Sequence, residues 1–340
     1  MTCRLGHRVC WQTHRASLMA ISEAKSLGIT YQDLLDADTH AVNPILRLQS
    51  NEDFGTHEVD VDRYLSQEFF DLEVEKVWRK VWQFACREEH IPNVGDTYVY
   101  DIADESILVV RSAPGEIRAF YNACLHRGRQ LREESGYSGE VMRCAFHGFA
   151  WHHDGTLAEI PSAWDFPHVE PEKFCLPEVQ VDSWGGFVFI NMDPDAESLE
   201  SFLGDLPSHF EKWAPKAKFV QAHVAKVLRC NWKVAQEAFN EAFHVTATHP
   251  QIMPSIGDQN SQYDSWGNFS RAMSPNATPS PYLTWEPTEQ EVFDAFTDRR
   301  LDQDPIMEIP EGATARATVA AGAREARRSR VSNIDEYCDA

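Results

Sequence analysis

Apolar residues first recur at helical spacing within residues 66–84. The apolar positions are Phe70, Val74, Val77, Trp78 and Val81, and charged side chains stand between them. A repeat of roughly 3.6 residues is typical of an amphipathic helix. We therefore expect one helix over residues 66–84.

The pattern changes to short β-rich runs between residues 94 and 122. Runs at 97–100, 107–110 and 117–120 are separated by turn signals such as Pro114-Gly115, which predicts an antiparallel meander. A further strand is expected at 186–191. It ends at Asp193-Pro194-Asp195, where the sequence becomes acidic and helical, so we place a domain boundary near residue 195.

The second half of the chain has a less regular pattern. Residues 232–246 carry an apolar stripe and are expected to form one helix that Pro250 stops soon afterwards. Residues 253–287 are rich in Ser, Pro, Gly and Asn, which predicts a loop. Residues 311–330 hold many Ala and Arg and could form a surface helix, although two glycines weaken it.

Composition narrows the class of protein. The 340 residues are 43% hydrophobic, enough for a substantial core, and charges break the longest apolar runs, so we expect no membrane span. Acids outnumber bases 53 to 31, which argues against nucleic acid as a partner.

Eight scattered cysteines fit a reducing compartment, and we expect a cytoplasmic protein. Residues 1–22 are basic but lack a sustained amphipathic pattern, so a disordered extension or a true start at Met19 is a simpler interpretation than a transit peptide.

Two short segments each combine one cysteine with one histidine. Cys124 and His126 lie in the sequence Cys-Leu-His-Arg-Gly, and Cys144 and His147 lie in Cys-Ala-Phe-His-Gly. Thiolate and imidazole at such spacing suit zinc or iron. Zinc fingers usually group their cysteines in one close pair and their histidines in another, whereas each pair here is mixed. A zinc site and an accidental spacing remain the alternatives.

These segments resemble the cluster loops of Rieske proteins, and the first matches the ring-hydroxylating oxygenase branch. The resemblance implies a two-iron, two-sulfur cluster held by Cys124, His126, Cys144 and His147, with both thiolates on one iron and both imidazoles on the other. The second loop departs from the common Cys-Pro-Tyr-His-Gly-Trp form, with changes that we expect to lie beside the ligands without touching them: Ala145, Phe146 and Phe149.

A second candidate site lies on the expected helix at 232–246. There Glu237, Glu241 and His244 fall on one helical face, and His249 follows where the helix ends. Two histidines and one carboxylate are the ligands of iron enzymes that activate dioxygen. Such a histidine pair by itself is a weak signal, because histidines with purely structural roles are common.

Residues 70–250 resemble the catalytic subunits of aromatic-ring-hydroxylating oxygenases. The resemblance implies that His244 and His249 bind one mononuclear non-haem iron, and that Glu241 bridges this site to a Rieske histidine of a neighbouring subunit. The family usually has Asp at the Glu241 position, although Glu occurs in relatives that oxidise quaternary ammonium compounds. The family's Glu-Asn pair appears here as Gln236-Glu237. The third ligand, a carboxylate, is expected beyond Ala340, which would make this a C-terminally truncated chain.

The expected fold class is α+β, with an antiparallel β Rieske domain joined to an incomplete, helix-grip-like α/β catalytic domain. Residues 1–60 would form an extension and arm, 61–195 a helix and the cluster domain, and 196–340 part of the catalytic domain. The resemblance implies an oxidoreductase that uses O2 to hydroxylate or cis-dihydroxylate an aromatic or related substrate.

The partners implied are a ferredoxin or flavin reductase that carries electrons from NAD(P)H, and further copies in a homotrimer, with or without small beta subunits. No nucleotide-binding fingerprint supplies electrons internally. Demethylation or monooxygenation of a quaternary ammonium or N-methyl compound is the alternative activity. A Rieske electron carrier without oxygenase activity is the alternative from another class.

Overall fold

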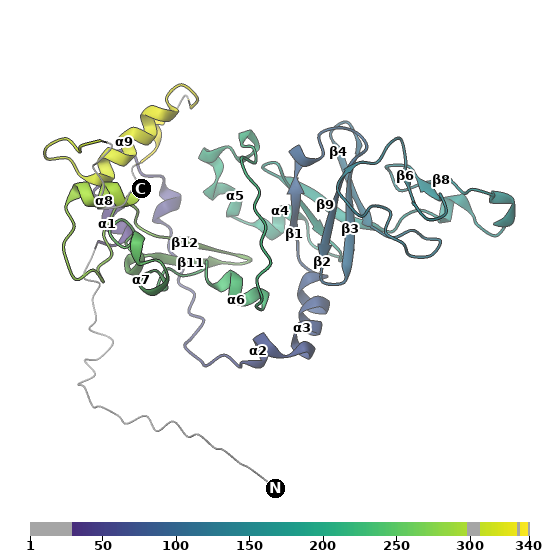
Figure 1. Cartoon of the computed structure of the whole chain (residues 1–340), viewed down its shortest axis with the longest axis horizontal. Coiled ribbons are helices and arrows are strands. Elements are labelled where there is room, and N and C mark those ends of the chain that lie inside the picture. The colour runs from purple at the N-terminus through teal and green to yellow at the C-terminus, as the bar shows by residue number, and fades with distance from the viewer. Residues whose placement is uncertain (1–28, 298–306, 332–333, 339–340) are drawn as a thin grey trace, which may run out of the picture. The chain divides into compact units, whose positions relative to one another are not determined.

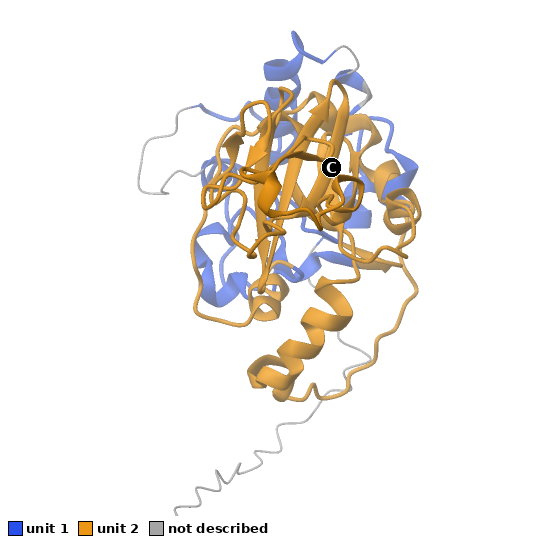
Figure 2. Ribbon diagram, turned by 90° about the vertical axis from the view of Figure 1, so that its right-hand side faces the viewer, with its two compact units in different colours: residues 1–47, 240–263, 271–340 blue, residues 48–239, 264–270 orange. Residues whose placement is uncertain are grey.

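The computed structural model describes residues 29–297, 307–331 and 334–338. Two compact units divide the chain: one combines the residues up to Arg47 with 240–263 and 271–340, and the other combines 48–239 with 264–270 (Figure 2). We call them the histidine-pair unit and the cluster unit. Residues 1–22, on which the transit prediction falls, lie outside the described part of the chain.

A seven-stranded antiparallel sheet forms the centre of the cluster unit (Figure 1). Its strand order is β1-β10-β9-β4-β3-β2-β5. The strands are β1 (Gln83–Arg87), β2 (Asp96–Ile102), β3 (Glu105–Ala113), β4 (Glu116–Tyr121), β5 (Gly136–Tyr137), β9 (Glu178–Trp184) and β10 (Phe187–Asn191). Strands β2, β3 and β4 pair in sequence order, so the predicted meander is confirmed, as is the strand expected at 186–191.

Strand β3 is buried on both faces. Ile107 and Val109 pack into one apolar cluster, while Leu108 and Val110 pack into another with Cys124 and Cys144. A short three-stranded sheet, β6 (Met142–Arg143), β7 (Ala150–Trp151) and β8 (Leu157–Glu159), contributes Met142 and Trp151 to the second cluster. A strand that is covered on both faces has a continuous run of apolar residues in its sequence, as residues 107–110 do.

The helix expected at 66–84 is only partly correct. Helices α2 (Asp62–Leu65) and α3 (Gln67–Glu73) lead into a π-helical turn (Val74–Trp78), and the chain then enters strand β1. The Ser66 hydroxyl accepts the Phe69 N–H and caps α3. The Gln83 amide donates to the Trp78 carbonyl, which satisfies an acceptor at the helix end. Residues 83 and 84 therefore belong to the sheet and not to the helix.

The segment after residue 195 forms short helices, as predicted. Helices α4 (Leu199–Leu203) and α5 (Leu206–His209) follow the Asp-Pro-Asp turn. Leu199 and Leu203 are buried against Trp82 of the cluster unit. The Trp82 indole also donates to the Glu197 carbonyl at 2.8 Å. The proposed domain boundary near residue 195 thus lies within the cluster unit, which continues to Phe239.

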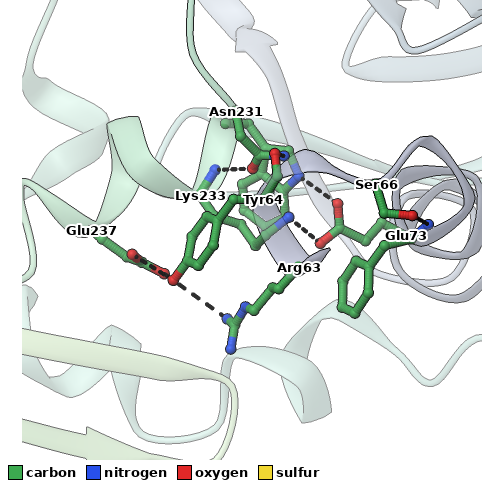
Figure 3. Close-up of polar contacts among 9 residues, drawn as sticks. Arg63, Tyr64, Ser66, Glu73, Asn231, Lys233 and Glu237 are labelled. Atoms are coloured by element: carbon green, nitrogen blue, oxygen red, sulfur yellow. Dashed lines mark hydrogen bonds and ion pairs between the residues drawn. The ribbon is translucent and has the colours of Figure 1, made fainter. Parts of the chain in front are cut away.

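A buried ion pair joins α3 to helix α6 (Trp232–Glu237) within the cluster unit (Figure 3). Lys233 Nζ lies 2.5 Å from Glu73 Oε1, and the two side chains are 5% and 7% exposed. The Trp232 indole donates to the other Glu73 oxygen at 3.0 Å. The lysine ammonium also lies 5.1 to 5.7 Å from the centroids of three aromatic rings, those of Trp232, Phe69 and Tyr64.

Two further contacts hold α6 against α2. The Tyr64 hydroxyl donates to the Glu237 carboxylate at 3.0 Å, and the Asn231 amide donates to the Tyr64 carbonyl at 3.2 Å. The Asn231 side chain in turn accepts the Lys233 N–H and caps α6. Both ends of this short helix are therefore fixed to the segment that precedes strand β1.

The histidine-pair unit is mainly helical. Its helices are α1 (Tyr31–Asp36), α7 (Val245–Thr248), α8 (Glu289–Phe296) and α9 (Ala315–Arg327). Val292, Phe293 and Ala315 bring α8 and α9 into one core cluster. The surface helix expected at 311–330 is confirmed as α9. In the described part of the chain no helix is both long and apolar enough to cross a membrane.

Two expectations for this region are wrong. Residues 253–287 are not all loop, because β11 (Gln262–Trp266) and β12 (Phe269–Met273) form a two-stranded sheet. The helix expected over 232–246 ends at Glu237, and a new one begins at Val245. In a continuous helix the N–H groups of Ala242 and His244 would donate four residues back. Here they donate to the Tyr263 hydroxyl and to the Glu241 carboxylate.

We predict that Glu73→Ala lowers the free energy of unfolding by about 3 kcal/mol, because it leaves the Lys233 ammonium buried without its carboxylate. Urea denaturation followed by circular dichroism measures the change. Glu75→Ala is the matched control, since Glu75 pairs with Lys76 on the surface, where both side chains are more than half exposed. Equal stability of the two variants would contradict a special role for the buried pair.

Candidate metal centres

The two cysteine-histidine loops close in the same way. Cys124 donates its N–H to the Arg129 carbonyl and accepts from Gly128, both at 2.8 Å. Cys144 likewise donates to Phe149 at 2.8 Å and accepts from Gly148 at 3.1 Å. In both loops the partners are four and five residues after the cysteine. The glycines have φ of +74° and +78°, a conformation that other residues rarely adopt.

The loops bring the four predicted ligands into one place. The Cys124 and Cys144 side chains are buried, at 3% and 2% exposure, within the core cluster of the sheet. His126 is half-buried and His147 exposed, and their ring centroids are 4.7 Å apart. The Nδ1 atom of His126 is buried without a hydrogen-bonding partner. An orphaned ring nitrogen beside two buried thiols fits a metal site, because such a nitrogen normally has a partner.

The electrostatics of the loops favour the same interpretation. Burial raises the pKa of the Cys124 thiol, and the adjacent Cys144 thiol raises this pKa further. A backbone hydrogen bond from His126 lowers the same pKa but does not cancel the increase. Two neighbouring buried thiols lose their protons together only when a cation compensates their charge. Desolvation lowers the pKa of His147, and the nearby His126 and Arg127 contribute, so the imidazole is neutral as a metal ligand must be.

The aromatic changes in the second loop touch the imidazoles, contrary to expectation. The Phe149 ring stacks on His126 with centroids 4.6 Å apart and planes at 7°. Phe146 lies 3.8 Å from the His147 ring, centroid to centroid, and is 54% exposed. Each histidine therefore has its own aromatic neighbour, one inside and one at the surface. The local motif does not predict the contact of Phe149 with His126, because this contact joins two loops that are far apart in the sequence.

The second candidate site is an open pair of histidines. The ring centroids of His244 and His249 lie 5.4 Å apart with planes at 72°, at the two ends of α7. His244 Nδ1 lies 2.5 Å from Glu241 Oε1, and the His244 N–H donates to Glu241 Oε2 at 3.1 Å. With Nδ1 bound to the carboxylate, Nε2 is the atom that His244 can offer a metal.

Burial alone would raise the pKa of Glu241, but the side-chain and backbone hydrogen bonds from His244 outweigh it and lower the pKa below its usual range. Glu241 is therefore an anion at neutral pH. A carboxylate at Nδ1 orients an imidazole and increases its basicity, as is common around metal-binding histidines.

Other acids of the second half of the chain have neighbours of their own where the structure describes them. Glu237 is not on a shared helical face with His244, since α6 ends there, and it accepts from Tyr64. Asp294 accepts from Gln290, and Asp335 pairs with Arg328. Asp298 and Asp302 lie outside the described residues. Among the side chains that the structure describes, no three His, Cys, Asp or Glu come together as ligands of a single metal ion.

One residue at this site was missed by sequence reasoning. The Tyr263 hydroxyl accepts the N–H of Ala242, the residue that follows Glu241, at 2.9 Å. The centroids of the Tyr263 and Phe243 rings lie 5.8 Å apart. The tyrosine lies on β11, in a segment whose composition suggested only loop. Residues 262–266 read Gln-Tyr-Asp-Ser-Trp and do not alternate apolar and polar side chains, so the pattern does not identify a strand.

Two protein-family models match the chain, one in each half. Residues 81–170 match the Rieske [2Fe-2S] domain, and residues 209–310 match the catalytic domain of ring-hydroxylating alpha subunits. The carnitine monooxygenase oxygenase subunit of Escherichia coli K12 is 31% identical over 61% of this chain and 56% of its own length. The anthranilate 1,2-dioxygenase large subunit of Acinetobacter baylyi is 30% identical over 59% and 44%.

A solved structure gives the same assignment of fold. A quaternary ammonium Rieske monooxygenase in complex with L-carnitine superposes with a TM-score of 0.57 and 25% identity, over 62% of this chain and 60% of that one. The chain thus spans 44% to 60% of the length of these relatives. The Rieske domain implies a 2Fe-2S cluster, and the catalytic domain implies a mononuclear iron.

We predict that Gly148→Ala lowers the amount of bound cluster per chain. The left-handed backbone there costs another residue about 1–2 kcal/mol, and an added Cβ would lie 3.1 Å from Pro161. Iron analysis and visible absorbance after anaerobic reconstitution measure the loss. Gly115→Ala is the control, with the same φ of +78° in a turn whose Cβ would meet open space. Equal cluster content in both variants would contradict the prediction.

Proposed function

The chain belongs to the Rieske oxygenase alpha subunits, and on that premise we propose that it is the oxygenase component of a dioxygen-dependent enzyme. It would use electrons passed through the cluster to hydroxylate or cis-dihydroxylate an aromatic or related organic substrate. The observation that carries the proposal is the presence of both ligand sets in one chain: two closed cysteine-histidine loops, and a histidine pair whose first member is held by a carboxylate.

When bound, the cluster supplies one-electron transfer and the mononuclear iron supplies dioxygen activation. The chain's own residues prepare these sites. Cys124 and Cys144 would hold the anionic side of the cluster inside the core, while His126 and His147 would lie toward the surface, where an electron can enter or leave. Glu241 holds the proton on His244 Nδ1 and leaves Nε2 for the metal.

Glu241 would also couple the two kinds of site between subunits. Its carboxylate is only one-third exposed yet reaches the surface, so that a histidine of another copy could share it. This role implies a homotrimer, with or without small beta subunits. Electrons would come from NAD(P)H through a separate ferredoxin or flavin reductase, and the proposed location is the cytoplasm.

A quaternary ammonium or N-methyl substrate is the second candidate. It is favoured by Glu241, which occupies a position where the ring-hydroxylating relatives usually have Asp, and by the 31% identity to a carnitine monooxygenase subunit. The identity to an anthranilate dioxygenase is nearly equal at 30%, so identity alone does not separate the two substrate classes.

Product analysis tests the proposal. The chain is reconstituted anaerobically with iron and sulfide, then supplied with NADH, a reductase, O2 and either aromatic acids or trimethylammonium compounds. Cluster reduction followed by a hydroxylated or demethylated product supports an oxygenase. A reducible cluster with two irons per chain and no product from either class would instead indicate an electron carrier. A colourless protein containing zinc would contradict both.

We predict that Glu241→Gln leaves reduction of the cluster unchanged and slows substrate oxidation at least about tenfold, because the neutral amide no longer holds the imidazole as a charged acceptor does. Stopped-flow reduction and product formation measure the two steps. Glu237→Gln is the matched control, four residues earlier, where the carboxylate accepts from Tyr64 instead. Turnover of Glu241→Gln equal to that of the control would refute the bridging role.

A further inference from the structure

We propose that Tyr263 is a positioning residue of the histidine-pair site, and that its hydroxyl sets the geometry in which Glu241 presents His244 to a metal. The proposal rests on the function proposed above, in which His244 and His249 bind iron. It adds a residue outside the ligand segment, on strand β11, to the parts on which that site depends.

Three hydrogen bonds meet at the turn that contains Glu241 and His244. Tyr263 Oη accepts the Ala242 N–H at 2.9 Å, and the two oxygens of the preceding residue, Glu241, accept the His244 N–H at 3.1 Å and contact His244 Nδ1 at 2.5 Å. The peptide between Glu241 and Ala242 thus links the tyrosine to the carboxylate. A shift of the backbone at that peptide would displace the Cα of Glu241, and with it the carboxylate that orients the imidazole.

The tyrosine hydroxyl is needed because the turn has left the helix. In a helix the Ala242 N–H would donate to the carbonyl of Ala238, but α6 has already ended at Glu237. Ala242 is 9% exposed, so its N–H cannot rely on bulk water, and an unsatisfied buried donor is costly. Tyr263 supplies the acceptor that replaces the missing helical one.

Packing holds the other side of the same turn. Ala242 and Val245 are buried against Met253, with Ile252 and Leu283 beside them. The backbone of residues 241–245 is therefore held by apolar contact, by the Val245 N–H that donates to the Ala242 carbonyl at 3.1 Å, and by the Tyr263 hydroxyl, which reaches it from strand β11. Apolar contact sets distance but not rotation, because it is non-directional, whereas the hydrogen bond specifies the orientation of the peptide.

Tyr263→Phe tests the proposal by removing only the hydroxyl. The full chain is titrated with Co²⁺ under anaerobic conditions after cluster reconstitution, and binding at the second site is followed by its ligand-field spectrum. We expect about tenfold weaker Co²⁺ binding and an altered spectrum, the scale typical of lost outer contacts to a metal ligand. Tyr282→Phe is the matched control in the same unit, since that side chain is 65% exposed.

His244→Ala in the same titration separates this inference from the function on which it rests. If His244→Ala binds Co²⁺ as the unmodified chain does, the histidine pair is not the metal site and the proposed function fails. If His244→Ala abolishes binding while Tyr263→Phe matches Tyr282→Phe, the site is real and the positioning role is wrong. The tyrosine would be merely structural if Tyr263→Phe bound Co²⁺ more weakly with an unchanged spectrum and also melted at a lower temperature. That result would overturn the proposal too.

Discussion

The buried ion pair of Glu73 and Lys233 is the interaction on which the cluster unit's second half depends. Neither charge can be left alone in the interior, because the desolvation penalty of an unpaired ion exceeds what any single neutral contact returns. The pair joins residues 160 positions apart, one just before the sheet and the other at the start of α6. The pair therefore specifies that α6 lies against α3. The aromatic rings around the ammonium further restrict the position of the Lys233 side chain.

The sheet and the cluster loops could be predicted because their signals are local. The run at 107–110 is apolar throughout and buried on both faces, and each loop carries its ligands within four residues. The end of α6 could not be predicted, because the Ala242 N–H is taken by a hydroxyl 21 residues later. Residues 83 and 84 fit the helical period as well as the strand they actually form, and only pairing with β10 decides between the two.

The two candidate centres are built by different physical means. The cluster loops are closed by backbone hydrogen bonds and by glycines with positive φ, so their shape depends little on neighbouring side chains. The histidine pair relies on side-chain contacts, from Glu241 to His244 and from Tyr263 to the backbone. Side-chain contacts can be lost through one substitution, whereas backbone closure survives most changes. This difference explains why the cysteine-histidine motif predicts its site by itself, whereas the histidine pair is identified only together with the resemblance of residues 70–250 to a known family.

Buried cations recur where the cluster unit changes direction. Arg87 on β1 donates to the carbonyls of Gly185, Pro215 and Lys218 and lies 4.4 Å from the Phe187 ring. Residues 219–230 then run exposed, without helix or strand, until Lys233 meets Glu73. In a chain of net charge −22, two of the 31 lysines and arginines are thus buried here. A cation is stable in the interior only when all its donors have partners. Arg87 therefore fixes where the chain enters this exposed segment, and Lys233 fixes where the chain leaves it.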